Sequence, residues 1–333
     1  FQAEDGIRDR SPSRGLGDVY KRQIRDSGTK YKVVEHPANL KILKECLKKL
    51  PGRKILTIEE TTTAQWLYVE LIDYVDKILI CEPFHNSLLK SGAKNDKIDA
   101  TKLCMLLRNG SLKEVFHTTD ELYKLRKLVS VYEDFVNASV RMKNQRSSMF
   151  LSEGKDHKKE RILTGNTINK FITEKQNLSI DHFALMRKEF ELIFQKIKKE
   201  NQTIQRLVKI SGIAEKLAVT ILAVVVDANR FESKYKYYAY CGLVKHFKKS
   251  GDRDYGKRNT RHSRRLKRCY KIAANAAICG NNDIREYYEY LIQNNYSYED
   301  ARNQIARYIA KASYAVMKNG TDYRPYQWRE NIK

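Results

Sequence analysis

The fold is decided by residues 54–81, KILTIEETTTAQWLYVELIDYVDKILIC. Residues 54–58 are a short apolar run, typical of a buried strand, and an acidic pair beginning with Glu59 ends it. Residues 64–75 are helix-like, and residues 77–81 are a second apolar run. Parallel strands need a crossover, so strand, helix and strand in this order predict a parallel sheet in an α/β domain.

The residues before this segment divide into two parts. Residues 1–23 show no periodicity and resemble the translation of a sequencing adapter, so we predict that they are not native and take no part in the fold. A disordered basic arm is the alternative. Residues 31–34 follow a set of turn residues and are expected to form the second arm of a hairpin. Residues 40–50 have helical spacing, and Pro51 and Gly52 stop the helix.

Three carboxylates occupy positions where a metal site can form. Glu59 follows a predicted strand, and parallel sheets bind ligands beyond the carboxyl ends of their strands. Asp96 and Asp99 open a predicted helix three residues apart, so they share a face. Converging carboxylates repel one another unless a cation joins them, and hard oxygen ligands favour Mg²⁺ or Mn²⁺. The alternative is that the two aspartates only stabilise the helix dipole.

Helical periodicity dominates the chain after residue 120. Residues 121–143 are expected to be a helix, and residues 152–166 a linker. Ser179 is expected to cap a long helix with an apolar seam typical of a coiled coil. This seam packs either against the helix 121–143 or against a second copy of the chain. Its positions are Phe183, Met186, Phe190, Ile193, Ile197, Glu200, Ile204 and Leu207.

Residues 210–214, ISGIA, resemble a helix-hairpin-helix turn, in which Gly212 lets backbone amides face a DNA phosphate. Ala214 stands where a second glycine is usual, so a plain connection between helices is the alternative. The helix 214–226 that follows is apolar and is expected in the core. It contains the longest apolar run of the chain, Leu217 to Val226, which is too short to cross a membrane.

The largest concentration of charge follows the aromatic segment 231–244. Residues 245–271 contain twelve cations and two anions around the pair Ser250 and Gly251, in what we predict to be a polar loop. These charges repel unless a polyanion neutralises them, and the net charge of +24 also favours nucleic acid. The alternative is a solvated surface loop. The cations are Lys245, Lys248, Lys249, Arg253, Lys257, Arg258, Arg261, Arg264, Arg265, Lys267, Arg268 and Lys271.

The tyrosines and cysteines are expected to be structural. Tyr235, Tyr237, Tyr238 and Tyr240 are predicted to pack in the core and against DNA, because a tyrosine recombinase arranges Arg and His residues around its nucleophile in a different order. The six cysteines have no metal-binding spacing, which predicts buried thiols in a reducing cytoplasm.

Two blocks of the sequence resemble one known family. The run TIEETTTAQWLY through CEPFHN to KNDKIDATKL is similar to the N-terminal half of DEDD transposases of the insertion sequence 110 family. The run ISGIAEKLAVTILAVVVDANRFESKYKYYAYCGLVKHFKKSG is similar to the C-terminal transposase domain of that family. The resemblance implies an α/β RuvC-like (RNase H-type) domain over residues 24–145, a linker and coiled-coil arm over residues 146–208, and a mainly α-helical transposase domain over residues 209–333.

The same resemblance implies that Glu59, Asp96 and Asp99 are catalytic acids that bind Mg²⁺ or Mn²⁺, with Glu60 as an alternative to Glu59. The first aspartate of the family lies on a strand before Ile24, where no residue matches, so we expect the first strand to be missing. The sequence leaves open whether this chain is active. The earlier aspartates, which lie in the adapter-like sequence, are Asp5, Asp9 and Asp18.

Ser250 matches the serine nucleophile of the family, which attacks a DNA phosphodiester and forms a covalent serine–DNA intermediate. Ser233 and Ser263 are the fallback candidates. The resemblance also implies element-end and target DNA, a non-coding guide RNA and a homo-oligomer (dimer or tetramer), in a bacterial or archaeal cytoplasm at the nucleoid. The residues predicted to bind nucleic acid are Gly212, Lys248, Lys249, Arg253, Lys257, Arg258, Arg261, Arg264 and Arg265.

Two other functions fit the same residues. In a metal-dependent, structure-specific nuclease the acids cut nucleic acid and Ser250 is inert. In a catalytically inactive remnant the chain only binds nucleic acid. A covalent protein–DNA product separates the recombinase from both.

Overall fold

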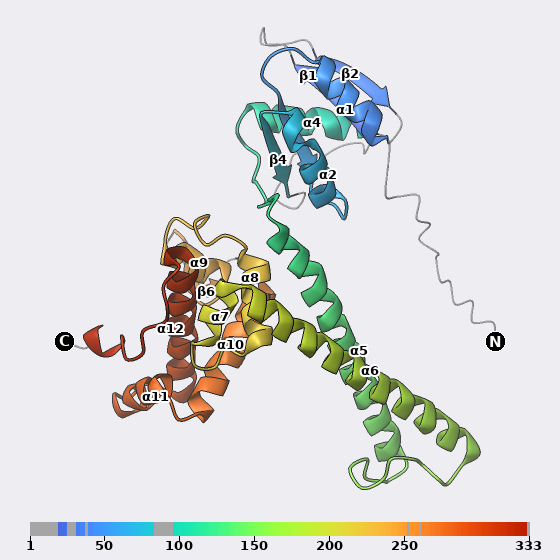
Figure 1. Ribbon diagram of the computed structural model, residues 1–333, viewed down its shortest axis with the longest axis vertical. Coiled ribbons are helices and arrows are strands. Elements are labelled where there is room, and N and C mark those ends of the chain that lie inside the picture. The colour runs from blue at the N-terminus through green and yellow to red at the C-terminus, as the bar shows by residue number, and fades with distance from the viewer. Residues whose placement is uncertain are drawn as a thin grey trace. The chain divides into compact units, whose positions relative to one another are not determined.

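The computed structural model describes residues 19–24, 31–36, 39–82, 96–251, 253–259 and 261–331. The chain divides into two compact units, unit 1 (Phe1–Thr119) and unit 2 (Asp120–Lys333). Unit 1 is a mixed α/β region and unit 2 is mainly helical, as the sequence predicts (Figure 1). The predicted domain boundary at residue 145 falls inside a helix of unit 2. The division into a RuvC-like domain, a coiled-coil arm and a transposase domain stays a prediction.

Unit 1 contains the predicted parallel strand pair. β3 (Ile55–Glu59) and β4 (Lys77–Cys81) run in parallel, with Glu59 opposite Cys81. α2 (Ala64–Leu71) and the 3₁₀ turn η2 (Ile72–Tyr74) connect them where the sequence predicts a single helix. The crossover confirms the predicted α/β arrangement and puts Glu59 at the carboxyl end of its strand.

The first elements of unit 1 are a hairpin and a helix. β1 (Val19–Ile24) pairs in antiparallel fashion with β2 (Tyr31–His36). Residues 19–23 therefore take part in the fold, contrary to our prediction, because strands pair through backbone groups and need no side-chain pattern. Whether residues 1–23 are native stays a prediction. α1 (Leu40–Lys49) begins at Leu40 as predicted, and the side chain of Asn39 caps it.

A small core holds unit 1 together. Leu43 and Leu47 of α1 pack with Leu71 of α2 and with Ile78 and Ile80 of β4, and all five side chains are buried. The helix therefore covers the parallel strand pair with the leucines that its spacing predicts. This packing fixes the strand ends that carry the acidic residues.

Two long helices of unit 2 lie side by side. The turn η3 (Glu121–Tyr123) leads into α5 (Lys124–Ser152), and α6 (Thr167–Glu200) returns along it (Figure 1). The Tyr132 ring lies 5.2 Å from that of Phe194, and farther along α5 Arg146 donates a hydrogen bond to Asn177. These contacts run in opposite order along the two helices, so the hairpin is antiparallel. Part of the predicted seam thus packs within the chain.

The start and end of the long helix differ from the prediction. Asn166, not Ser179, caps α6, and the Ser179 hydroxyl donates to the Lys175 carbonyl at 3.1 Å. A serine can satisfy its hydroxyl in this way inside a helix, so residue type alone misplaced the cap. At the other end Asn201 caps a new helix, α7 (Gln202–Val208), which carries the last seam positions.

α8 (Glu215–Val225) is the central helix of unit 2. All its side chains from Leu217 to Val225 are buried, which confirms the predicted core helix. Arg126 of α5 donates to the Ala223 carbonyl at 2.9 Å and so satisfies a carbonyl at the end of α8. The remaining helices of unit 2 are α9 (Lys234–Tyr240), α10 (Arg264–Cys279), α11 (Asp283–Gln293), α12 (Tyr298–Asn319) and the 3₁₀ turn η4 (Arg329–Asn331).

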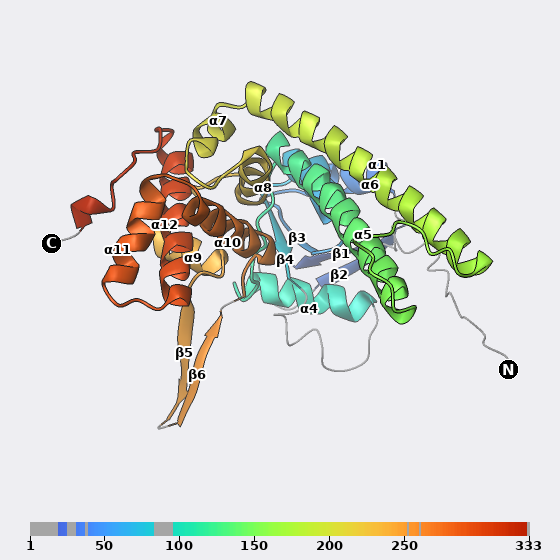
Figure 2. The ribbon, with the colours of Figure 1, turned by 90° about the horizontal axis from the view of Figure 1, so that it is seen from below.

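The predicted polar loop around Ser250 is instead a β-hairpin. β5 (Lys245–Ser250) pairs in antiparallel fashion with β6 (Arg253–Asn259), with an irregularity between Phe247 and Lys249. The hairpin projects from the helices of unit 2 (Figure 2). Neither of its faces is apolar, and the period-two pattern that identifies a strand is therefore absent from the sequence.

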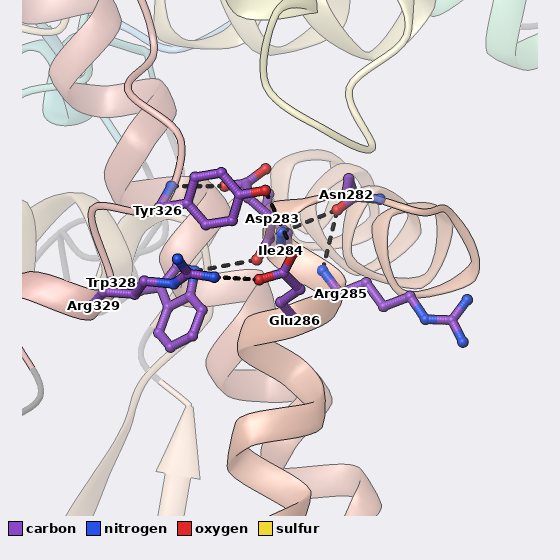
Figure 3. Close-up of polar contacts among 8 residues, drawn as sticks. All are labelled: Asn282, Asp283, Ile284, Arg285, Glu286, Tyr326, Trp328 and Arg329. Carbon is purple, nitrogen blue, oxygen red and sulfur yellow. Dashed lines mark hydrogen bonds and ion pairs between the residues drawn. The ribbon is translucent and has the colours of Figure 1, made fainter.

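The segment after α12 packs against the start of α11 (Figure 3). Asp283 is only 5% exposed, and its carboxylate accepts hydrogen bonds from the hydroxyls of Tyr323 and Ser211. The backbone N–H of Tyr326 also donates to this carboxylate, and the Trp328 indole donates to the Asp283 carbonyl at 3.2 Å. One buried carboxylate therefore joins the turn 210–214, α11 and the C-terminal segment.

All six cysteines are free thiols. Cys81, Cys241 and Cys269 are buried as predicted, whereas Cys279, at the end of α10, is exposed. Cys46 and Cys104 are intermediate. No helix in the described part of the chain is long and apolar enough to cross a membrane.

Candidate active site

Two of the predicted acids interact at the carboxyl end of β3. Glu59 ends β3 and is partly buried, and Asp99 lies on α4 (Asp96–Arg108), which packs against β3. Burial, and then the negative charge of Asp99, raise the pKa of Glu59 above its ordinary value of 4.5. The two carboxylates therefore repel each other, as predicted for acids that converge on one place.

Asp99 has a buried oxygen that its surroundings do not satisfy. Its Oδ1 accepts no hydrogen bond from any described residue. An unsatisfied buried acceptor costs about 1–3 kcal/mol, and more when it is charged. A divalent cation would satisfy this oxygen and screen its repulsion with Glu59. The two carboxylates thus fit a hard cation such as Mg²⁺ or Mn²⁺.

The third predicted acid, Asp96, stays a prediction as a metal ligand. Asp96 is the first residue of α4, but its side chain lies outside the part of the chain that the structure describes. Among the described side chains, no three His, Cys, Asp or Glu residues are grouped so that they could hold a metal ion. Glu59 and Asp99 alone are therefore the observed part of the acidic site.

Glu60 has a different partner from Glu59. Its carboxylate lies 3.3 Å from Nε2 of His117, whose Nδ1 is 3.2 Å from the Val115 carbonyl oxygen. Successive side chains of an extended chain point to opposite sides, so Glu60 does not share the surroundings of Glu59. The contacts thus favour Glu59 as the metal ligand, a choice that the sequence left open.

Ser250 lies at the tip of the β5–β6 hairpin. Gly251 follows it with a φ of +57°, a conformation that glycine adopts without strain in tight hairpin turns. Arg253 is the register partner of Ser250, and Cβ atoms of directly opposed residues lie about 4.5–5.5 Å apart. Gly251 and Arg253 are both exposed to solvent. The Ser250 side chain itself is outside the described atoms.

The rest of the hairpin combines cations with exposed aromatic rings. Phe247 is 61% exposed, and the ammonium of Lys257 lies 4.9 Å from its ring centroid. Tyr255 is also exposed. Exposed aromatic rings among cations are typical of surfaces that bind single-stranded nucleic acid. The predicted nucleic-acid-binding residues on this hairpin are Lys248, Lys249, Arg253, Lys257 and Arg258.

The fallback serines have structural roles. The Ser233 hydroxyl accepts a hydrogen bond from the backbone N–H of Lys236 and caps α9. The Ser263 hydroxyl accepts one from the N–H of Leu266 and caps α10. Such caps use the oxygen that a nucleophile would need. Of the three candidate serines, Ser250 is the one at an exposed hairpin tip.

Two of the tyrosines considered as recombinase nucleophiles, Tyr237 and Tyr238, are buried in the core of unit 2. The hydroxyl of Tyr237 is hydrogen-bonded to that of Tyr270, which contacts Ser313 Oγ at 2.7 Å. Burial raises the pKa of Tyr237 and Tyr270 well above the ordinary value, and the pKa of Tyr238 to about 12. Such hydroxyls are poor nucleophiles, and the burial of Tyr237 and Tyr238 confirms the predicted core packing for these two tyrosines. Tyr235 is exposed.

Gly212 is required by packing. Its φ is +88°, and a Cβ on this residue would lie 2.1 Å from the Ala273 carbonyl oxygen of α10. The flanking Ile210 and Ile213 are buried. A close contact with α10 therefore explains this glycine, in keeping with a plain connection between helices. Its predicted contact with a DNA phosphate stays a prediction.

Two cations of α10 pair with one carboxylate of α5. Arg265 and Arg268 both pair with the Glu133 carboxylate of α5, with 2.7 Å between Arg265 Nε and Glu133 Oε2. Arg261 and Arg264 are exposed. Glu133 is not among the residues predicted from the sequence, because it lies 132 residues from Arg265 and no local pattern indicates such a pair.

Interacting carboxylates at a strand end, together with a strongly basic helical unit, are features of an enzyme that acts on nucleic acid. Residues 24–152 match the transposase family model of the DEDD domain of IS110 proteins, and residues 204–289 match the model described as "Transposase IS116/IS110/IS902 family". The chain belongs to the IS110 family of transposases, and it is therefore a DNA-binding enzyme of transposition. No curated protein matches the chain.

Proposed function

We propose that this transposase exchanges DNA strands through a covalent bond between Ser250 and DNA, assisted by Mg²⁺ or Mn²⁺. The observation that carries the proposal is the position of Ser250 at the tip of an exposed, basic hairpin, in register with Arg253. A serine there can approach a DNA strand without any rearrangement of the core. The other two candidate serines use their hydroxyls as helix caps.

The proposed reaction is a phosphoryl transfer. The Ser250 Oγ attacks phosphorus, so an Oγ–P bond forms and a bond from phosphorus to one ester oxygen breaks. The serine proton passes to a base, and the released oxygen takes up a proton. Arg253 and the neighbouring lysines stabilise the negative charge that develops on the phosphoryl oxygens. The serine phosphodiester keeps the energy of the broken bond, so a later hydroxyl can attack it and rejoin strands.

Unit 1 supplies the acidic site in this proposal and has a RuvC-like fold. The parallel pair β3–β4, its helical crossover and the acids on β3 and α4 support that fold. Glu59, Asp96 and Asp99 would hold the cation. When bound, the cation lowers the pKa of a coordinated hydroxyl and neutralises phosphate charge. The unsatisfied Asp99 oxygen and the raised pKa of Glu59 support this role, because a cation relieves both.

A structured RNA is the proposed second nucleic acid. Its support is the family resemblance and the net charge of +24, which can neutralise more phosphates than one DNA site presents. The exposed Phe247 and Tyr255 can stack on unpaired bases of either nucleic acid. The RNA would choose the DNA by base pairing, while the hairpin brings Ser250 to the phosphate.

The covalent product is the direct test of the proposed function. The full chain is incubated with labelled element-end DNA and Mg²⁺, with and without RNA transcribed from the element. A parallel sample uses protein in which residues 1–23 are replaced by the segment that the native gene encodes before Ile24. We expect DNA that stays attached to protein in denaturing gels, and a peptide that mass spectrometry identifies as phosphorylated at Ser250. We expect the yield to rise when the RNA is present.

Each other result contradicts a defined part of the proposal. Cleavage without a covalent product in both samples would identify a metal-dependent nuclease. Binding without cleavage or product would identify an inactive nucleic-acid-binding remnant. A product linked through another residue would overturn the assignment of Ser250. Equal yields with and without RNA would remove the RNA from the reaction.

The proposal includes a homo-oligomer, supported by an apolar stripe on the outer face of α6. Phe171, Leu178, Leu185 and Leu192 recur every seven residues and are 54–65% exposed. On a helix this spacing puts them on one face, opposite the face that packs Phe194 against α5. Burying each side chain stabilises by about 1.5–3 kcal/mol, so a second copy of α6 is a favourable partner. Soluble proteins seldom leave such a stripe uncovered.

Charged substitutions in this stripe are expected to separate the subunits. Leu178→Lys with Leu185→Lys puts two cations in the centre of the proposed interface, and we expect the mass measured by light scattering to fall to that of one chain. Tyr298→Lys on α12, which changes a residue that is 71% exposed, is the matched control and should leave the mass unchanged. A wild-type chain that is already monomeric, or an unchanged mass in the double variant, would contradict the interface.

A further inference from the structure

One face of α10 carries a row of cations that the hairpin does not explain. Arg264, Arg268, Lys271 and Asn275 are exposed and follow one another at intervals of three or four residues, which places them along one face of the helix. The exposed Ile272 lies in the same region. A shallow cavity of about 330 Å³ opens over this face, and it is lined by Arg264, Lys267, Arg268, Lys271, Ile272 and Asn275.

The charge of this face is poorly compensated within the protein. Arg265 and Arg268 share a single carboxylate, that of Glu133. Arg264, Lys267 and Lys271 form no ion pair with any described residue. α10 contains no acidic residue, and its cations lie in its first half, where the helix dipole disfavours positive charge.

Neighbouring cations make the repulsion stronger. Burial, and then the charges of Lys271 and Lys245, lower the pKa of Lys267 below its ordinary value. Lys245 belongs to β5, so the base of the hairpin adds to the potential of the helix face. Arg302 of α12 donates a hydrogen bond to Asn275 at 3.2 Å and extends the row past its last lysine. A bound anion would relieve this repulsion.

We infer that the α10 face, with Arg264, Lys267 and Lys271 as its free cations, binds the phosphodiester backbone of a nucleic-acid strand at a site separate from the tip of the hairpin. Successive helix turns place these cations about 5.4 Å apart along the axis, so they suit a ligand with repeated anions better than a single phosphate. Ile272 offers an apolar contact for the sugars between the phosphates. The inference rests on nucleic-acid binding by the proposed function, but not on the chemistry of Ser250.

This face also revises the predicted binding residues of α10. The sequence predicts nucleic-acid binding by Arg264 and Arg265, the first two residues of the helix. Arg265 is directed to Glu133, whereas Lys267 and Lys271 line the cavity. The function of α10 in this inference is to hold a strand by its backbone, which positions the strand without reading its sequence.

The salt dependence of binding tests the inference. In a Ser250→Ala background, the variant Arg264→Gln/Lys267→Gln/Lys271→Gln is compared with its parent by fluorescence anisotropy from about 50 to 300 mM salt. We expect the slope of log K against log salt to decrease by about one for each lost contact, and the affinity at about 0.15 M salt to fall on the order of a hundredfold. Duplex DNA, single-stranded DNA and structured RNA are measured separately, and the ligand whose slope changes identifies the strand.

Two matched variants control for net charge and for folding. Lys143→Gln/Lys196→Gln/Lys199→Gln removes the same charge from exposed positions of α5 and α6 and should keep the slope. Arg264→Lys/Lys267→Arg/Lys271→Arg keeps the charge of the α10 face and should therefore also keep the slope of log K against log salt. An unchanged slope in the glutamine variant for all ligands, or an equal decrease in the charge control, would overturn the inference. Covalent product formation by the chain with an intact Ser250 would then still support the proposed function.

Discussion

Ser250→Ala is expected to abolish the covalent protein–DNA product and to lower strand transfer on the order of 10⁶-fold, the scale seen when an enzyme loses its serine nucleophile. The reason is that no other hydroxyl at the hairpin tip can take its place among the described residues. DNA binding should change by no more than about twofold, because the cations of the hairpin and of α10 are retained. Denaturing gels with labelled DNA and anisotropy measure the two quantities on the same samples.

Ser263→Ala is the matched control for this result. It removes a hydroxyl that caps α10, so it should cost about 1 kcal/mol of stability, measured by thermal unfolding, and leave the covalent product in place. If the product persisted in Ser250→Ala, or disappeared in Ser263→Ala at a temperature where the variant is folded, the nucleophile would have to be reassigned. Ser250→Cys extends the test, because a thiolate can attack but forms a different linkage that mass spectrometry distinguishes.

Glu59→Gln is expected to lower strand-transfer activity by about 10³-fold or more. The same substitution is expected to stabilise unit 1 at neutral pH when no metal is bound. The carboxylate is needed to hold the cation, but without the cation it is partly buried and repelled by Asp99. The raised pKa of Glu59 fixes the sign of the pH dependence. Its contribution to stability is complete below pH 4.5 and is lost as the pH rises through the raised pKa. The stability gained by Glu59→Gln should therefore grow with pH over this window.

Thermal unfolding with and without metal measures both parts of this prediction. At a concentration a hundred times its Kd, Mn²⁺ should stabilise the wild-type chain by about 2.7 kcal/mol, and it should have little effect on Glu59→Gln or Asp99→Asn. The binding of Mn²⁺ should weaken as the pH falls and Glu59 takes up a proton. Glu60→Gln, which removes the partner of His117, is the control and should keep the metal effect. Loss of the metal effect in Glu60→Gln but not in Glu59→Gln would instead assign the metal to Glu60.

Several parts of the molecule were predictable because they depend on local patterns. The apolar runs of residues 54–81 predict two parallel strands with a crossover, and the structure contains that pair. The apolar run in α8, which only Thr220 interrupts, predicts a core helix, since a helix that is apolar on every side must be covered by protein. The helix cap at Asn39 is also local, because its hydrogen bonds join residues two and three positions apart.

Other features were misread where two structures share one local pattern. Ser179 is a suitable cap residue, but a serine can equally bond to its own helix, and only the chain before it decides which. The residues around Ser250 look like a loop because their charges hide the strand period, and backbone pairing alone makes the hairpin. Both errors follow from judging a backbone conformation by side-chain type.

The sequence by itself determined the α/β start, the helical remainder and the basic charge, because composition and spacing act over a few neighbouring residues. It indicated the candidate acids by their positions at a strand end and a helix start, and the candidate serine by its resemblance to the family. Tertiary structure decided which groups meet. In the folded chain Asp99 lies close to Glu59, and Glu60 contacts His117. Arg265 pairs with the carboxylate of Glu133, 132 residues away. These contacts depend on how helices and strands pack, and packing is a property of the whole folded chain that no short pattern contains.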